Sequence, residues 1–348
     1  MDPITDKPGM TRRGYDGAWR TMAEEVARAA LPGLRVCCPT CKREGTLLPK
    51  WKPGLAAKPL FVVHANGCRD ALEMCSLSED QASLIRSEVR LTARDVRKTL
   101  RMGRPFVLFS GGQDSLCVLE YMRNLCEKAG VTVTALHADT TAGFPEVERY
   151  VKRVCRKLGV PLVTVSPPEN FFDLAKKWGI PGVRARWCCK TLKVAPMRRF
   201  LRGLDEPVVI YDGIRAAESS ARAKYTPLWF HPSFRCVSVS PIFTWSDSQV
   251  ERYVARHDLP RSPAHKLGCS AECWCGAYKA RGDFERLLDI HPEIFNELVA
   301  VEEAQGGRFT FMYENGHKVA LESLRKGKQQ GHLVQGVRAG NGEPRYEP

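Results

Sequence analysis

Residues 106–115 (Phe-Val-Leu-Phe-Ser-Gly-Gly-Gln-Asp-Ser) place a glycine-rich turn and small polar side chains directly after a short apolar run. Gly111 and Gly112 allow the backbone to approach a ligand closely and to adopt a positive φ without steric cost. An amphipathic run over residues 115–128 follows. The turn therefore leads into the first amides of a helix, where unpaired N–H groups attract phosphate. The pattern predicts a strand, a phosphate-binding loop and a helix.

The polar side chains of this loop extend the prediction. Ser110, Gln113 and Ser115 offer hydrogen-bonding groups, whereas Asp114 is acidic and is expected to orient the loop or a Mg²⁺ ion rather than touch phosphate. The loop differs from a Walker A loop, which needs a Lys-Ser/Thr pair after its glycines. The alternative interpretation is a tight strand-to-helix turn without a ligand.

Many of the 14 cysteines are clustered along the chain. The first ten residues are polar and contain two prolines, so we expect no export signal and interpret the cysteines as thiols and metal ligands rather than disulfides. Four cysteines lie in helix or strand patterns and are predicted to be small core residues: Cys117, Cys126, Cys155 and Cys236.

Residues 35–76 form a short segment with metal-ligand spacing. Cys38-Pro-Thr-Cys41 is a C-x2-C pair, and strand-like runs over 46–51 and 60–64 precede further ligand types. Two ligands from the pair and two from the far side of a hairpin suit tetrahedral Zn²⁺, which would stabilise a unit too small to bury a core. The segment resembles a zinc ribbon. The preferred ligands are Cys38, Cys41, His64 and Cys75, with Cys68 as a substitute for Cys75 and Cys37 as a bystander. A cysteine-rich loop without metal is the alternative.

Strand-like and helical runs alternate after the glycine loop. The pattern predicts strands over 131–138, 161–165 and 207–211, and helices over 144–158, 171–178 and 196–204. Such alternation predicts an α/β fold with a doubly wound, mostly parallel sheet. Ligands of these folds bind at the carboxyl ends of strands, where the glycine loop, Asp139 and the pair Asp212-Gly213 all fall. Further helices are predicted over 79–102, with a serine cap at 76 or 78, and over 247–257 and 292–305.

Composition divides the chain into five segments. We expect an N-terminal arm (1–34), the zinc-ribbon-like module (35–78), a nucleotide-binding α/β domain (79–245), a helical cysteine-rich segment (246–324) and a basic tail (325–348). No run of eighteen apolar residues predicts a membrane span, so a cytoplasmic protein is expected. The formal charge of +14 favours an anionic partner such as a nucleotide or nucleic acid, although a soluble surface with a basic bias is the alternative.

Five stretches, in order, resemble the phosphoadenylyl sulfate / adenylyl sulfate reductase family. This family shares the PP-loop fold of the adenine-nucleotide α-hydrolase-like (HUP-like) proteins. The resemblance covers about residues 100–305. Its motifs are Ser110–Ser115; Asp139-Thr140 with Phe144-Pro145-Glu146; Cys188-Cys189-Lys190 with Lys193 and Pro196; Gly213–Ser219 with Arg222; and Pro241–Trp245 through Gly268-Cys269 to Cys273 and Cys275.

The resemblance implies an adenine nucleotide over Ser110–Ser115, near Asp139 and Gly213. It also implies that Arg215 and Arg222 hold phosphate or sulfate oxygens, which guanidinium groups bind bidentately. Glu218 is expected to orient one of these arginines. In the alternative interpretation, Arg215 and Glu218 form a surface ion pair that contributes little.

The iron–sulfur branch of the family binds a [4Fe-4S] cluster through an adjacent Cys-Cys pair and a later C-x2-C pair. Cys188-Cys189 matches the first pair. In place of the second, C-x2-C pair of the family, the chain has Cys269-x3-Cys273-x-Cys275. Four thiolates are needed. Cys273 and Cys275 are preferred and Cys269 is the substitute. A structural zinc at the same thiols is the alternative.

The resemblance leaves three functions open. Thiol-dependent family members carry a nucleophilic cysteine on a C-terminal tail, whereas here none follows Cys275, and the loop keeps the form associated with cleaving ATP between its α and β phosphates. The first hypothesis is an Mg²⁺-dependent ATP α-hydrolase with Asp114, Asp139 and Arg215 as catalytic residues. It would be linked to sulfur transfer onto tRNA or DNA, or to a defence system such as a type IV CRISPR locus. The alternatives are sulfonucleotide reduction, with Cys117 or Cys236 as the thiol, and a non-catalytic nucleotide- and nucleic-acid-binding accessory protein.

Overall fold

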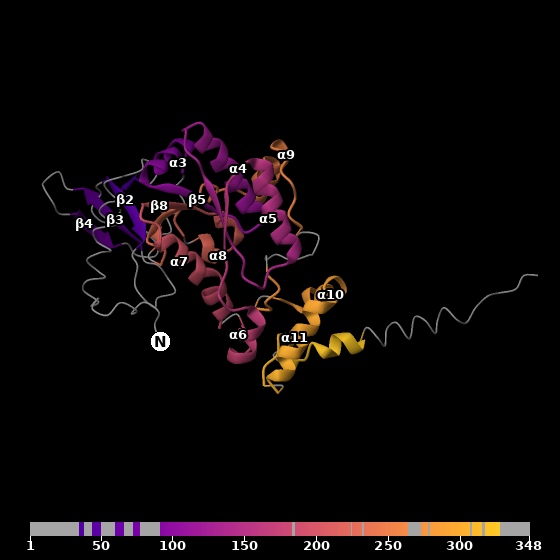
Figure 1. Cartoon of the computed structure of the whole chain (residues 1–348). Coiled ribbons are helices and arrows are strands. Elements are labelled where there is room, and N and C mark those ends of the chain that lie inside the picture. The colour runs from indigo at the N-terminus through magenta and orange to yellow at the C-terminus, as the bar shows by residue number, and fades with distance from the viewer. Residues whose placement is uncertain are drawn as a thin grey trace, which may run out of the picture. The chain divides into compact units, whose positions relative to one another are not determined.

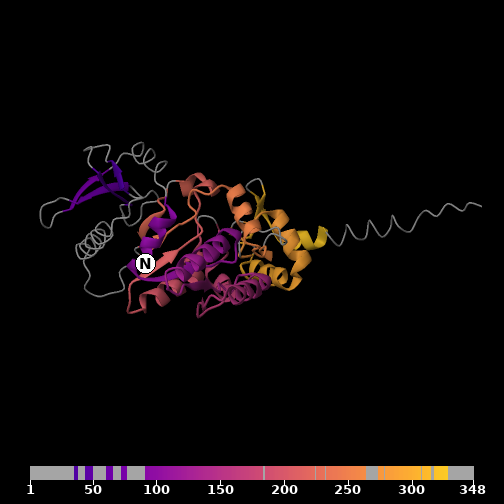
Figure 2. The ribbon, with the colours of Figure 1, turned by 90° about the horizontal axis from the view of Figure 1, so that it is seen from above.

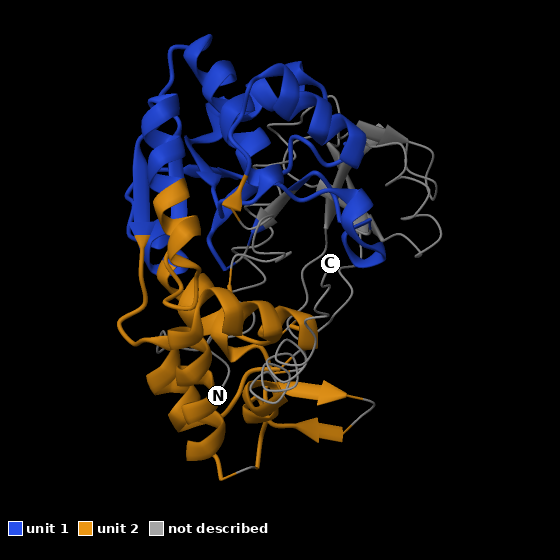
Figure 3. Ribbon diagram, turned by 90° about the vertical axis from the view of Figure 1, so that its right-hand side faces the viewer, with its two compact units in different colours: residues 1–137, 151–164, 197–261 blue, residues 138–150, 165–196, 262–348 orange. Residues whose placement is uncertain are grey.

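The computed structural model describes residues 91–327, apart from 183–184, 224, 232, 264–272, 278, 307 and 315–316, together with four N-terminal strands. Contacts within the chain define two compact units. The first comprises residues 1–137, 151–164 and 197–261, and the second comprises residues 138–150, 165–196 and 262–348 (Figure 3).

A six-stranded sheet has the order β7-β6-β5-β8-β10-β9. β5 pairs in parallel with β6 and β8, β8 pairs in parallel with β10, and only the edge strand β9 pairs antiparallel, so the predicted α/β fold with a mostly parallel sheet is confirmed. The sequence pattern does not predict β9 or β10. The bounds are β5 (Arg104–Leu108), β6 (Thr134–Ala138), β7 (Leu162–Val165), β8 (Val208–Tyr211), β9 (Leu228–His231) and β10 (Cys236–Val239).

Helices cover both faces of this sheet. α4 (Gln113–Glu127) and α5 (Pro145–Leu158) lie side by side on one face, whereas α7 (Ala195–Arg202) lies on the other (Figures 1 and 2). Phe200 of α7 packs edge-on against Phe106 of β5, with ring centroids 5.7 Å apart. α9 (Asp247–Arg256) packs against α4, where its Tyr253 donates a hydrogen bond to the buried Glu120. The glycine loop thus leaves a buried strand and enters a helix held by its neighbours.

The predicted continuous helix over 79–102 is wrong at residues 91–92, which are not helical. α3 begins at Ala93 and ends at Thr99, and a 3-10 turn covers Leu100–Met102. Thr92 caps α3 because its hydroxyl accepts from the amide of Asp95 at 3.2 Å while the Asp95 carboxylate accepts from the amide of Thr92 at 3.1 Å. This reciprocal capping box starts a new helix.

The second unit, orange in Figure 3, is mostly helical. Its elements are α6 (Phe171–Trp178), a π-helix (Cys189–Val194), α10 (Arg281–Ile290), α11 (Pro292–Ala304) and the hairpin β11 (Met312–Glu314) with β12 (His317–Val319). The sequence pattern does not predict the π-helix, α10 or the hairpin. Buried Glu302 accepts hydrogen bonds from the Thr310 hydroxyl at 2.7 Å and from the amides of Phe311 and Leu321, each at 2.8 Å. These bonds fasten the hairpin to α11.

The C-terminal end of the described chain is helical over residues 322–327. The predicted basic tail therefore overlaps this helix by three residues, and its remainder, 328–348, lies outside the described residues. Within the part that the structure covers, no helix is both long and apolar enough to cross a membrane.

The N-terminal strands form an antiparallel sheet in the order β1-β2-β3-β4. Their bounds are β1 (Arg35–Cys37), β2 (Glu44–Pro49), β3 (Leu60–Ala65) and β4 (Leu72–Ser76). His64 of β3 is in register with Glu73, and Cys75 of β4 is in register with Val62, so the two predicted ligands lie on neighbouring strands. Cys38, Cys41 and Cys68 lie outside the described residues, and the zinc site stays a prediction.

Candidate functional site

The glycine loop presents an uncapped helix N-terminus. Gly111 has a φ of 85°, in the left-handed region that favours glycine, and Gly112 is the N-cap of α4 without a side-chain hydrogen bond. The serines brace the turn: Ser110 Oγ accepts from the Gly112 amide at 3.2 Å, and Ser115 Oγ donates to the Gly112 carbonyl at 2.9 Å. The first amides of α4 thus have no side-chain cap, as a phosphate site requires.

Gln113, the first residue of α4, has a buried side-chain amide whose hydrogen-bonding groups are unsatisfied. Its Oε1 and Nε2 are both buried, and neither has a hydrogen-bond partner among the residues that the structure describes. A buried amide without partners costs free energy that a polar ligand would recover. This orphaned amide stands directly beside the uncapped helix end.

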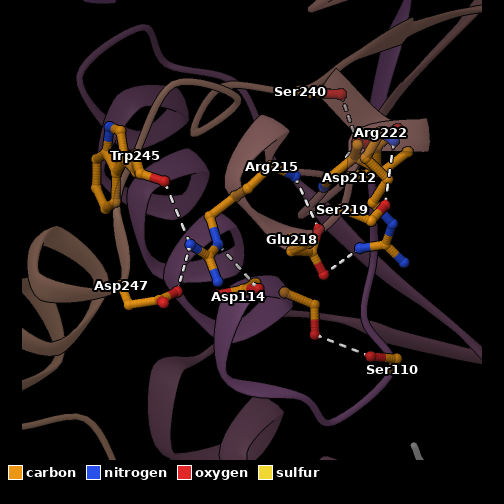
Figure 4. A network of polar contacts seen from close by, with 12 residues as sticks. Ser110, Asp114, Asp212, Arg215, Glu218, Ser219, Arg222, Ser240, Trp245 and Asp247 are labelled. Atoms are coloured by element: carbon orange, nitrogen blue, oxygen red, sulfur yellow. Dashed lines mark hydrogen bonds and ion pairs between the residues drawn. The ribbon is translucent and has the colours of Figure 1, made fainter. Parts of the chain in front are cut away.

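The turn after β8 packs on the same helix end (Figure 4). A Cβ added at Gly213 would lie 2.9 Å from the Asp114 carbonyl carbon and from the Ser115 nitrogen, so only glycine fits there. The preceding Asp212 accepts from Ser238 Oγ at 2.8 Å and Ser240 Oγ at 2.6 Å. Burial raises the pKa of Asp212, and these two hydrogen bonds oppose the shift.

Arg215 is a buried cation held between two carboxylates (Figure 4). Its Nε lies 3.0 Å from Asp114 Oδ2, its Nη1 lies 2.8 Å from Asp247 Oδ1, and Nη1 also donates to the Trp245 carbonyl at 3.2 Å. Burial raises the pKa of Asp114, and the Arg215 charge opposes that rise. The alternative interpretation, a surface ion pair of Arg215 with Glu218, is wrong, because the Arg215 guanidinium is buried against Asp114 and Asp247 and Glu218 accepts from the Arg215 backbone amide at 2.9 Å.

Glu218 forms its ion pair with Arg222, on the short helix α8 (Ser220–Ala223). The Arg222 side chain is 42% exposed, against 8% for Arg215. Of the two predicted anion-binding arginines, Arg222 is therefore the more accessible. Asp247 is not among the predicted site residues, because its Ser-Asp sequence indicates only the start of a helix.

Asp139 directly follows β6 and belongs to the second unit. Its carboxylate accepts from the Thr141 amide at 2.9 Å and from Ser166 Oγ at 3.4 Å. Thr141 has a φ of 54°, and its hydroxyl accepts from the amide of Phe171 at 2.9 Å. Asp139 thus shapes a strained turn, and its catalytic role stays a prediction.

Four predicted ligands form a cysteine cluster in the second unit: Cys188, Cys189, Cys273 and Cys275. Cys188 Sγ lies 3.7 Å from Cys275 Sγ, which lies 3.5 Å from Cys273 Sγ. The hydrogen bond between Cys188 and Cys189 lowers the pKa of Cys189 and raises the pKa of Cys188 to about 12. Among the residues with described positions, no three His, Cys, Asp or Glu side chains are arranged to hold a single metal ion. Cys269 lies outside the described residues.

Trp274 positions two of these thiols. Its amide donates to the Ala142 carbonyl at 2.9 Å, and its indole Nε1 donates to the Gly143 carbonyl at 3.0 Å. Its ring stacks on Phe172 at 5.0 Å. The buried indole therefore fixes the turn that carries Cys273 and Cys275.

The four cysteines predicted as core residues are all buried, as expected. Burial raises the pKa of Cys126 to about 11 and that of Cys117, Cys155 and Cys236 to about 12. These thiols are therefore protonated at neutral pH, and a thiol is a far weaker nucleophile than a thiolate.

Comparison with known proteins identifies the family. The profile of the phosphoadenosine phosphosulfate reductase domain matches residues 104–287, more than half of the chain. The chain belongs to this family, as the sequence motifs predict.

Individual relatives share about a third or less of their residues with this chain over the matched regions. An uncharacterised protein of Methanocaldococcus jannaschii is 32% identical over 55% of this chain and 40% of its own length. An adenosine 5'-phosphosulfate reductase of Salinibacter ruber is 26% identical over 45% of this chain and 60% of that protein. Sulfate adenylyltransferase subunit 2 of Streptomyces lavendulae is 31% identical over 45% of this chain and 54% of that protein. The chain thus spans about half the length of these relatives.

Proposed function

We propose that this chain binds ATP at the glycine loop and cleaves it between the α and β phosphates, releasing pyrophosphate. The observation that carries the proposal is the uncapped N-terminus of α4 beside the orphaned amide of Gln113. Phosphate oxygens would supply acceptors for the helix amides and for the Gln113 amide group. The relative named as a sulfate adenylyltransferase subunit supports adenylyl chemistry.

The side chains around the loop have separate roles in this proposal. Arg222, half-exposed on α8, would bind phosphate oxygens and stabilise the charge that develops on them. Arg215 would act mainly by fixing Asp114, since its guanidinium already contacts two carboxylates. Asp114 Oδ2 contacts Arg215, and the carboxylate fits a role as a Mg²⁺ ligand. Bound Mg²⁺ would neutralise phosphate charge. Asp139 remains a proposed catalytic carboxylate on the family resemblance alone.

The cysteine cluster is the proposed site of the sulfur-ligated metal centre. Two observations support this proposal: four thiols are gathered in one region, and the hydrogen bond with Cys188 lowers the pKa of Cys189. Cys188, Cys189, Cys273 and Cys275 would hold a [4Fe-4S] cluster, with zinc as the alternative occupant. A bound cluster would supply iron–sulfur chemistry to a sulfur-transfer reaction.

The acceptor of the adenylyl group would be a nucleic acid, either tRNA or DNA, or a component of a defence system. The basic composition supports an anionic acceptor. The predicted zinc-ribbon module, with Cys38, Cys41, His64 and Cys75 (or Cys68), would assist its binding. A non-catalytic accessory protein that binds a nucleotide and a nucleic acid is the third candidate function.

Sulfonucleotide reduction is the second candidate function. The family match and the adenosine 5'-phosphosulfate reductase of Salinibacter ruber favour it. However, Cys117 and Cys236 do not suit the role of its nucleophile, because both are buried and the pKa of each is raised to about 12. A reductase would therefore need another thiol, such as one delivered by a partner protein.

One assay separates these functions. Anaerobically prepared protein is incubated with ATP and Mg²⁺, or with adenylyl sulfate and a thiol donor, and pyrophosphate and sulfite are measured. We expect pyrophosphate from ATP, reduced at least about a hundredfold by Asp114→Ala. The control Asp205→Ala, which alters an exposed carboxylate, should leave the rate unchanged. Sulfite release without pyrophosphate would support the reductase instead.

A further inference from the structure

Three exposed aromatic rings lie in the second unit. Trp178 is 48% exposed, Phe309 is 43% exposed and Tyr313 is 56% exposed. Exposed lysines and an arginine accompany them. We call these seven residues the aromatic–basic surface: Lys176, Lys177, Trp178, Arg308, Phe309, Tyr313 and Lys318.

Contacts between α6 and the segment after α11 join the first part of this surface. Gln305 Nε2 donates to the carbonyl of Lys176 at 2.9 Å and to that of Ala175 at 3.3 Å. The Phe309 ring covers Gly179, since a Cβ placed there would lie 3.7 Å from the ring. Phe309 therefore lies beside the C-terminal end of α6, which carries Trp178.

The hairpin formed by β11 and β12 connects Tyr313 and Lys318 to the rest of the aromatic–basic surface. Lys318 Nζ donates to the Arg308 carbonyl at 2.5 Å, and Lys318 is directly opposite Tyr313 in the pairing of β12 with β11. Opposite residues of an antiparallel pair lie on the same face. Tyr313 and Lys318 therefore continue the surface from Phe309.

The Trp178 ring packs against other aromatic rings of the second unit. Its ring meets that of Trp187 edge-on at 5.5 Å, and Trp187 in turn stacks on buried Phe171 at 5.6 Å. Trp187 Nε1 also donates to the Gly179 carbonyl at 3.1 Å. An exposed ring held by packed neighbours loses little freedom when a flat ligand stacks on it.

We propose that the aromatic–basic surface binds single-stranded nucleic acid. Unstacked bases would stack on the rings of Trp178, Phe309 and Tyr313, while the basic side chains contact phosphates. The acidic side chain of the hairpin, Glu314, is paired with Arg281 at 2.9 Å, so its charge is offset. The inference deepens the proposed function by assigning a surface to its nucleic-acid acceptor. It is tested without ATP, so its failure and that of ATP cleavage are distinguishable.

The experiment measures binding of the full chain to fluorescent single-stranded DNA and RNA oligonucleotides and to a duplex, by anisotropy across a salt series. We expect tighter binding of a single strand than of the duplex, whose bases are already stacked. Trp178→Ala with Phe309→Ala should weaken single-strand binding at least about fivefold. Trp178→Phe alone keeps an aromatic ring and leaves Phe309 intact, so it should retain most of the wild-type affinity for a single strand. Lys318→Gln should reduce the salt slope by about 0.7.

Ile290→Ala is the matched control, because Ile290 is 44% exposed in the same unit but outside the surface. It should bind as the wild type does, and circular dichroism checks that each variant is folded. Equal affinity of wild type and the double aromatic variant, or equal loss in Ile290→Ala, would overturn the proposal. So would a change of oligomeric state without a change in oligonucleotide affinity, which would assign the surface to a second copy of the chain.

Discussion

Arg215 has a structural role that its motif does not disclose. The guanidinium is buried and links Asp114, on the first turn of α4, to Asp247, on the first turn of α9. The sequence predicts Arg215 as an anion-binding residue, but the two carboxylates that meet it come from distant parts of the chain. Such partners cannot be predicted from one sequence, because only the folded backbone brings them together.

Asp212 should make stability depend on pH. Its folded-state pKa is raised above the ordinary 3.8 because it is buried, so the folded chain binds the proton more tightly than the unfolded chain. The resulting stabilisation is full below about pH 3.8 and is lost as pH rises through the raised pKa. Asp212→Asn should therefore flatten this fall in urea-unfolding free energy between pH 4 and 8, whereas Asp205→Asn, at an exposed position, should not. A steeper fall in Asp212→Asn would contradict this assignment.

At the scale of elements, the loop and the turn after β8 depend on each other. A methyl group at Gly213 would collide with the backbone of Asp114 and Ser115, which cannot move without shifting the start of α4. We expect Gly213→Ala to cost about 1–3 kcal/mol of unfolding free energy and to weaken ATP binding. Calorimetry of both quantities checks this. Gly182→Ala is the control, since a Cβ there meets no described atom within 4 Å, and an equal loss of unfolding free energy in both variants would refute the collision.

The sequence predicts some elements better than others for physical reasons. β5, β6 and β8 are mostly buried and rich in apolar residues, and Ser246 caps α9 through its hydroxyl, so apolar content and cap residues mark these elements. α10 has no side-chain cap at Ala280, and the hairpin strands are only three residues each. The hairpin depends on Glu302 of a different element, and a tertiary contact of this kind leaves no local signal.

At the scale of the whole molecule, the metal content of the protein tests whether the cysteine cluster binds a metal centre that stabilises the fold. Wild-type protein prepared without oxygen should contain iron or zinc by elemental analysis, and a chelator should lower its melting temperature. Cys188→Ser should remove the metal, whereas Cys155→Ser, at a buried thiol outside the cluster, should retain it. Metal-free wild type, or equal metal content in both variants, would exclude the proposed centre.

The chain passes between its two units five times, after residues 137, 150, 164, 196 and 261. The second unit is therefore assembled from three separate stretches, and during synthesis it cannot be completed until the ribosome has passed residue 262. Its first two stretches must wait, with apolar side chains such as Phe171 unburied, for the third to arrive. Chaperone dependence during translation is the expected consequence of this interleaved topology, and no single cut in the gene would release either half as an independently folding piece.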